Sequence, residues 1–252
     1  MPSIQQAISH YNAELEKLFP NERPTFNPKA VLFDMDGVIY DSMPHHAIAW
    51  TQSMAQFGIN MSRHDAYATE GARGFDTVRD MVRRQKGITI SEERAKEMYQ
   101  VKADIFHNMP EAPIFEGVRE LMAKIVACGM TVNVVTGSAQ KPLINRLLTD
   151  FSDFLVPEHI TTAYDVSRGK PNPDPYLTGL RKAGDLRPWE GIVVENAPLG
   201  VRAGVAARCF TVAVNSGPLP DSALTDEGCD LLYPAITDLL NDWPRLMAAV
   251  RQ

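Results

Sequence analysis

Two patterns of hydrophobic positions alternate along most of this chain. Short apolar runs of strand length alternate with longer segments in which apolar residues recur every three or four positions. The short runs predict strands at 30–33, 130–138, 159–166, 191–196, 209–215 and 231–232. The longer segments predict helices at 117–128, 141–148, 174–183, 198–206 and 236–250. Strands that alternate with helices form parallel sheets with right-handed crossovers, so the pattern predicts an α/β fold.

The first 28 residues follow a different pattern. Apolar residues at helical spacing over 4–19 predict one amphipathic helix, and Pro20, Pro24 and Pro28 end it and make an extended link. Because this helix precedes the first strand, we expect an accessory element packed on the core. A contact within a dimer is the alternative.

Residues 43–110 read as helical, and we find no convincing strand pattern in them. Helices are predicted at 45–57, 62–70, 75–86 and 91–107. A helical block inserted directly after a strand suggests a lid domain, and the alternative is that these helices belong to the main core. We therefore expect an N-terminal helix and linker (1–28), an α/β core domain (29–42 and 111–252) and a helical cap domain (43–110).

Composition and charge narrow the class of protein. The 252 residues are 44% hydrophobic and 22% charged, which is ordinary for a globular protein. A net charge of -6 argues against a nucleic-acid surface, and three widely spaced cysteines fit a reducing compartment. We find neither an apolar run long enough for a membrane span nor a signal peptide. We expect a soluble, cytoplasmic monomer or weak dimer that acts on a small molecule.

Two carboxylates follow the first predicted strand. Asp34 and Asp36, two residues apart, can face one cleft where the chain turns at Gly37. Paired carboxylates suit a nucleophile, a general acid or base and a hard metal ion. The alternative is an Asp-Gly turn without chemistry. We expect the site to face solvent, so that replacing Asp34 changes stability little.

Polar groups also follow three later segments. Thr136, Gly137 and Ser138 end a strand and open a helix, as a phosphate cradle does. Lys170 offers a point charge for phosphate oxygens, and Glu195 and Asn196 offer further oxygen ligands for Mg²⁺ beside Asp34. Singly, these could be a turn, a solvated lysine and a helix cap. At one edge of a parallel sheet they converge, which predicts a phosphoryl-transfer site.

The same stretches carry a family resemblance. DMDGV, VVTGS, GKPNPDPY and VVENAPLG resemble the four motifs of the haloacid dehalogenase (HAD) superfamily, over about residues 29–250. The helical insert resembles the cap of its β-phosphoglucomutase-like subfamily. The resemblance implies a Rossmann-like core, a helical cap and Mg²⁺-dependent chemistry on a small phosphate ester.

The resemblance also implies roles for single residues. Asp34 would take the phosphoryl group, and Asp36 would protonate the leaving oxygen and then activate water or a sugar hydroxyl. The phosphoryl oxygens would be held by Thr136, Gly137, Ser138 and Lys170. The magnesium shell would comprise Asp34, Asp36, Glu195 and Asn196. Asn196 stands where the subfamily usually has Asp, which predicts weaker Mg²⁺ binding or binding together with the phosphate.

The cap motif departs from the mutase pattern. Glu70 replaces a lysine and would repel a second phosphate, and Arg73 lies one position early. His46 and Lys102 fall where the mutase has its cap histidine and lysine, but a single His or Lys is more often an ordinary helix-surface residue. We expect hydrolysis of a small sugar phosphate through an aspartyl phosphate. The alternatives are a β-phosphoglucomutase-type isomerase and a weakly active HAD-like binding module.

Overall fold

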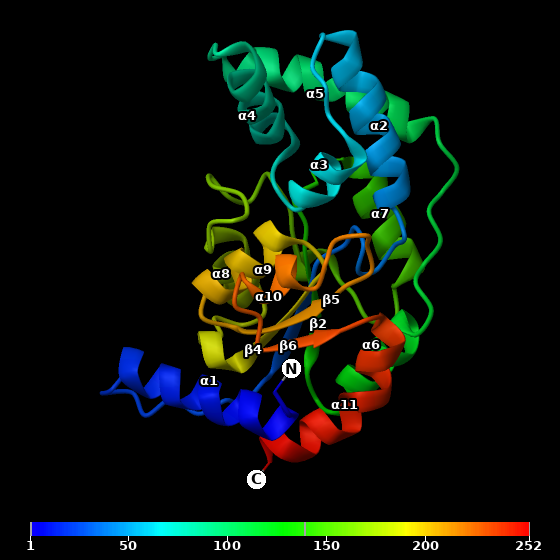
Figure 1. Ribbon diagram of the computed structural model, residues 1–252. Helices are drawn as coiled ribbons and strands as arrows, with labels where there is room; N and C mark the ends of the chain where they lie inside the picture. The colour runs from blue at the N-terminus through cyan, green and yellow to red at the C-terminus, as the bar shows by residue number, and fades with distance from the viewer. Residues whose placement is uncertain (1, 139, 252) are drawn as a thin grey trace.

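A six-stranded parallel sheet forms the centre of the computed structural model, which describes residues 2–138 and 140–251 (Figure 1). The strands are β1 (Ala30–Phe33), β2 (Thr131–Val135), β3 (Ile160–Thr161), β4 (Gly191–Glu195), β5 (Phe210–Val214) and β6 (Leu231–Tyr233). Their order is β3-β2-β1-β4-β5-β6, and every neighbouring pair is parallel. This order is that of doubly wound nucleotide-binding folds, and the α/β prediction is confirmed.

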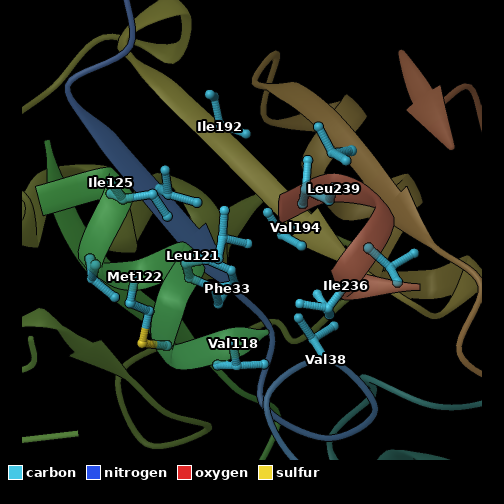
Figure 2. Packing of buried hydrophobic residues seen from close by; sticks show 14 of the residues in the cluster. Phe33, Val38, Val118, Leu121, Met122, Ile125, Ile192, Val194, Ile236 and Leu239 are labelled. Carbon is cyan, nitrogen blue, oxygen red and sulfur yellow. The ribbon is translucent and has the colours of Figure 1, made fainter. Parts of the chain in front are cut away.

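The central strands are apolar throughout because helices cover both faces of the sheet. On one face, Val31 and Phe33 of β1 join a large cluster with α6 (Val118–Ala127) and α11 (Ile236–Val250). Figure 2 shows side chains from α6 and α11 converging on Phe33 and Val194. On the other face, Ala30 and Leu32 pack with α8 (Asp174–Lys182) and α9 (Pro198–Ala206).

The N-terminal helix α1 (Ile4–Leu18) belongs to this core. Ser3 starts it with a capping box, and its buried side chains are Ala7, Ile8, Tyr11 and Leu15. The Tyr11 ring lies edge-on to Phe210 of β5 at 5.3 Å, and its hydroxyl donates to the Arg208 carbonyl at 2.7 Å. The helix is thus an accessory packed on the sheet, as expected.

Four helices inserted after β1 form an all-α cap: α2 (Met43–Gln56), α3 (Arg63–Ala68), α4 (Gly74–Lys86) and α5 (Glu92–His107). They enclose their own apolar cluster, which includes Met54, Val78 and Ala95, and Leu219 from the core joins it. In Figure 1 they lie together beyond the carboxyl ends of the strands. The remaining helices are α7 (Lys141–Asp150) and the short α10 (Ser222–Thr225).

Within the described residues, no helix is both long and apolar enough to cross a membrane.

Candidate active site

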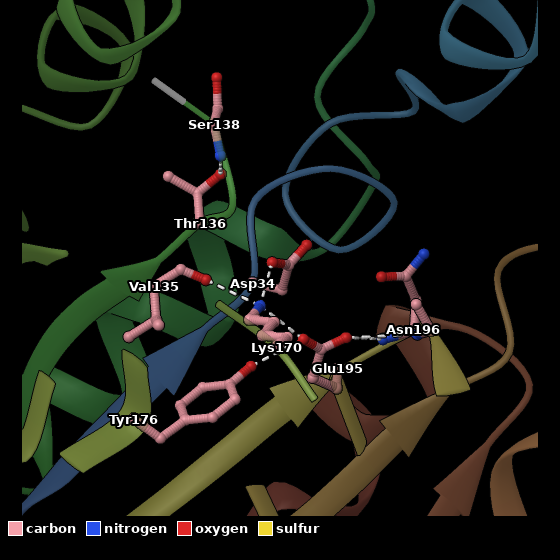
Figure 3. Close-up of polar contacts among 9 residues, drawn as sticks. Asp34, Val135, Thr136, Ser138, Lys170, Tyr176, Glu195 and Asn196 are labelled. Carbon is pink, nitrogen blue, oxygen red and sulfur yellow. Dashed lines mark hydrogen bonds and ion pairs between the residues drawn. The ribbon is translucent and has the colours of Figure 1, made fainter. Parts of the chain in front are cut away.

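A buried lysine joins two carboxylates at the carboxyl edge of the sheet (Figure 3). Lys170 Nζ lies 2.5 Å from Asp34 Oδ1 and 2.6 Å from Glu195 Oε1, and it also donates to the Val135 carbonyl at 3.0 Å. Asp34 is fixed by the sheet, since its amide donates to Val194 O of β4. The expectation that Asp34 faces solvent was wrong: only 2% of it is exposed, and Lys170 lies against its carboxylate.

The charges of this triad are unbalanced. Burial raises the pKa of Asp34 to about 8; the Lys170 ammonium opposes this shift, and the carboxylate of Glu195 adds to it. Burial lowers the pKa of Lys170, but Asp34 and Glu195 raise it by more, so the lysine stays charged at neutral pH. One ammonium therefore serves two carboxylates. A further cation beside Asp34 would favour its ionised form.

Glu195 uses both of its oxygens within the protein. Oε1 accepts from Lys170 and from the Tyr176 hydroxyl at 2.7 Å, and Oε2 accepts from the amides of Asn196 and Ala197. Both amides belong to residues that precede α9, and α9 has no side-chain N-cap hydrogen bond, so the helix-cap alternative for Glu195 was wrong. Its place in a metal shell stays a prediction.

Two buried oxygens near this triad remain free. Asp34 Oδ2 and Asn196 Oδ1 have no hydrogen-bond partner among the described residues. A hard cation with oxygen ligands fits such a pair of acceptors. His, Cys, Asp and Glu alone form no group of three suited to a metal within the described residues, so the amide of Asn196 would have to take part.

Asp36 lies at the end of a buried hydrogen-bonded chain. Its Oδ1 accepts from Ser42 Oγ at 2.6 Å and lies 3.0 Å from His46 Nε2, and Lys102 Nζ lies 2.5 Å from His46 Nδ1. The Lys102 ammonium can only donate a hydrogen bond, so His46 Nδ1 is the acceptor. The proton of the His46 ring is therefore on Nε2, which donates to Asp36. Although burial opposes it, His46 and Ser42 lower the pKa of Asp36 to about 2.

The surface interpretation of His46 and Lys102 was wrong. Lys102 is 2% exposed and lies over the Phe106 ring, on which His46 also stacks at 4.2 Å. Burial lowers the pKa of Lys102 to about 8, while Asp36 opposes the shift. The sequence carried a signal that we did not use: Lys102 stands between Met98 and Phe106 on the buried face of α5.

The loop after β2 has the form of a small polar cradle. Thr136 Oγ1 accepts from the Ser138 amide at 3.0 Å, and Ser138 Oγ accepts from the Gln140 amide at 3.2 Å. A Cβ on Gly137 would lie 2.6 Å from the carbonyl oxygen of Gly71 in the cap, so this position needs glycine. The cap therefore lies directly on the loop.

Arg73 lies at the seam between the cap and the core. Its Nε donates to Asp76 at 2.6 Å, and one terminal nitrogen donates to the Ser167 carbonyl at 2.6 Å. Its guanidinium also lies over the Phe75 ring. The side chain is thus engaged with its own helix and with a core loop.

Between the cap and this edge of the sheet lies a small pocket. Its lining includes Asp36, His46, Trp50, Glu70, Tyr99, Lys102, Gly137 and Ser138. The structure thus brings together eight predicted site residues around one buried region: Asp34, Asp36, His46, Lys102, Gly137, Ser138, Lys170 and Glu195. Tyr176, which donates to Glu195, was not predicted, because a tyrosine in an amphipathic helix resembles any core residue.

A doubly wound sheet with paired carboxylates after its first strand, a buried lysine and a helical cap defines a capped phosphoryl-transfer enzyme. The model of the haloacid dehalogenase-like hydrolase family matches residues 31–214, and the chain belongs to this family.

Named relatives include both phosphatases and mutases. Hexitol phosphatase A of Escherichia coli is 30% identical over 188 residues, which are 75% of this chain and 83% of the relative. Beta-phosphoglucomutase of Bacillus subtilis is 27% identical over 210 residues, covering 75% and 84%. A solved structure from Bacteroides vulgatus, described as "Putative beta-phosphoglucomutase", is 43% identical with a TM-score of 0.91, covering 99% and 98%. The protein is thus a HAD-family phosphatase or β-phosphoglucomutase-like enzyme.

Proposed function

We propose that this enzyme hydrolyses a small sugar monophosphate, with Asp34 as nucleophile, Asp36 as general acid and base, and Mg²⁺ as cofactor. The observation that carries the proposal is the different setting of the two carboxylates. Asp34 is paired with Lys170 through one oxygen and keeps the other free, whereas Asp36 is hydrogen-bonded to Ser42 and His46.

In the first step one oxygen of the Asp34 carboxylate attacks phosphorus while Thr136, the Gly137 amide and Lys170 hold the phosphoryl oxygens. Asp36 gives a proton to the leaving alkoxide and later accepts one from the attacking water. Its proton can arrive from Lys102 through His46, which takes a proton at Nδ1 and releases one at Nε2. Asp34 and Asn196 would hold the magnesium ion, which neutralises charge between the carboxylate and the phosphate.

The two cationic side chains of the cap are already bonded within the protein, and this favours hydrolysis over isomerisation. A mutase must hold a second phosphate, yet Arg73 is bonded to Asp76 and Ser167, and Lys102 is bonded to His46. The mutase remains the second candidate, because His46 and Lys102 fall where the mutase pattern has its cap His and Lys, and both are buried. The intact Asp34, Asp36 and Lys170 argue against an inactive binding module.

We further propose that residues 43–110 move as a cap over a core formed by 29–42 and 111–252, with 1–28 as helix and linker. Substrate would enter when the cap opens, and closure would exclude bulk water from Asp34.

The test measures phosphate release from a panel of sugar monophosphates with Mg²⁺, beside conversion of β-glucose 1-phosphate to glucose 6-phosphate. We expect release without a bisphosphate activator, and no release by Asp34→Asn. Isomerisation with little phosphate release would establish the mutase instead.

A further inference from the structure

Glu70 extends from the cap toward the reacting groups. It follows α3, and the next residue, Gly71, contacts the core at two points. Its carbonyl lies against Gly137, and a Cβ built on Gly71 would lie 3.1 Å from Lys170 Cδ. The loop is thus held directly above the phosphate cradle, and Glu70 lines the pocket.

The region around this pocket has more negative than positive charge. Asp36, Glu70 and Lys102 line the pocket, and the separate triad of Asp34, Lys170 and Glu195 adds two carboxylates and one ammonium group. Both lysines are already engaged, Lys170 by Asp34 and Glu195, and Lys102 by His46. A bound Mg²⁺ and a phosphate dianion carry equal and opposite charge, so they leave this excess unchanged.

Glu70 has the least compensation of the four. No hydrogen bond to its carboxylate is found among the described residues, whereas the other three accept from Lys170, Ser42, His46 or Tyr176. Burial, together with the charges of Asp36 and Asp34, raises the pKa of Glu70 well above its ordinary range, so its ionised form is favoured only when a donor or a cation lies beside it. A second anion at this end of the pocket would increase the imbalance. A hydroxyl or an ammonium group would supply the missing donor.

Resting on the proposed function, we propose that Glu70 determines substrate specificity. Its carboxylate accepts a hydrogen bond from a hydroxyl or ammonium group on the part of the substrate farthest from the phosphate. It also excludes esters that carry a second anion there. The substrate class is therefore a phosphate monoester with a polyhydroxyl or amino end, and sugar bisphosphates and phosphorylated sugar acids are rejected.

The experiment compares matched pairs: glucose 6-phosphate with 6-phosphogluconate, and fructose 6-phosphate with fructose 1,6-bisphosphate. Glucosamine 6-phosphate tests the ammonium donor. Each is measured as a competitive inhibitor of p-nitrophenyl phosphate hydrolysis, in wild type, Glu70→Gln and Glu70→Lys. Glu97→Gln and Glu97→Lys are the charge-matched controls, because Glu97 lies on the cap surface with its side chain 64% exposed.

We expect wild type to bind the member of each pair that carries only one anionic group at least about tenfold more tightly. Glu70→Gln should reduce this ratio and Glu70→Lys should reverse it, while the Glu97 variants keep the wild-type ratio. Equal binding within pairs, or a ratio unaffected by both Glu70 variants, would overturn the proposal. If wild type does not hydrolyse p-nitrophenyl phosphate or the sugar phosphates, the proposed function fails. Calorimetric titration of wild type with the same pairs of phosphate esters then still measures the affinity ratio within each pair.

Discussion

Lys170 is the residue on which the stability of the site depends. It is buried between Asp34 and Glu195, and removing one member of a buried ion pair leaves an uncompensated charge. In Asp34→Asn the lysine keeps Glu195, and the new amide oxygen can still accept from it. In Lys170→Met two buried carboxylates lose their shared cation.

We therefore expect Asp34→Asn to lose turnover at unchanged or slightly higher stability. Lys170→Met should lose both turnover and about 3 kcal/mol of unfolding free energy. The expectation that Asp34 can be replaced without loss of stability is kept, but for a different reason: burial disfavours its charge. Denaturant unfolding of the two variants measures the difference, and equal stabilities would contradict this account of the triad.

Asn196 permits a second prediction for a single residue. Its Oδ1 is buried without a partner among the described residues, and Asp34 Oδ2 is in the same state. Asn196→Asp would place a negative charge beside the proposed cation, so Mg²⁺ binding should become tighter by about 1 kcal/mol. Calorimetric titration with Mg²⁺ checks this. Weaker or unchanged binding would argue against Asn196 as a ligand.

The sequence predicted which residues the strand ends would bring together, because parallel strands share one carboxyl edge. It did not reveal what surrounds them. The burial of Lys102 and His46 depends on packing between α2 and α5, and the engagement of Arg73 depends on where the cap meets residues 167–169. Such contacts between distant segments leave no local pattern.

Among the elements, β3 differs most from its prediction. The pattern predicted a strand over 159–166, but only Ile160–Thr161 is extended in the sheet. The Asp165 carboxylate accepts from the amide and hydroxyl of Thr162, and this local bonding turns the chain away from the ladder. Long apolar helices and buried strands were predicted closely, because their periodicity is strong.

Asp230 links β5 to the loop before β6 and should make stability depend on pH. Its Oδ2 accepts from the Thr211 amide at 2.7 Å, and burial raises the pKa of Asp230 to about 7, against these backbone hydrogen bonds. The folded state therefore holds this proton more tightly than the unfolded state does. The stability contributed by the protonated form is complete below about pH 4 and is lost as pH rises through about 7.

Asp230→Asn keeps an acceptor for Thr211 and removes the charge. Its unfolding free energy should equal that of wild type near pH 4 and exceed it by about 4 kcal/mol near pH 8. Thermal unfolding of both proteins across this range measures the difference. A difference that does not change with pH would show that Asp230 is not the group responsible.

For the molecule as a whole, the observed contacts are those of a closed cap. Arg73 bonds to Ser167, Tyr99 accepts from Gln140, and Gly71 lies on Gly137. The α/β core and the helical insert were both predictable from periodicity. The closeness of the cap to the core was not predictable from periodicity, since it depends on glycines that permit contact between the two backbones.

If turnover needs the cap to open, a covalent link across the seam should stop it. A Cβ on Gly169 would lie 2.7 Å from Arg73 Cγ, so cysteines at both positions would place their side chains next to each other across the seam. Oxidised Arg73→Cys/Gly169→Cys should lose phosphate release, and a reductant should restore it. Each single variant is the control, and full activity of the cross-linked protein would contradict cap opening.

The central claim is that Asp34 takes the phosphoryl group, and trapping that intermediate tests it most directly. In Asp36→Ala an activated aryl phosphate needs little protonation to leave, while loss of the general base slows attack by water, so phosphorylated Asp34 should accumulate. Borohydride reduction followed by peptide mass spectrometry should then find homoserine at position 34, and only after incubation with substrate. Hydrolysis of the same ester by wild type, with position 34 unmodified in the trapped variant, would contradict the account.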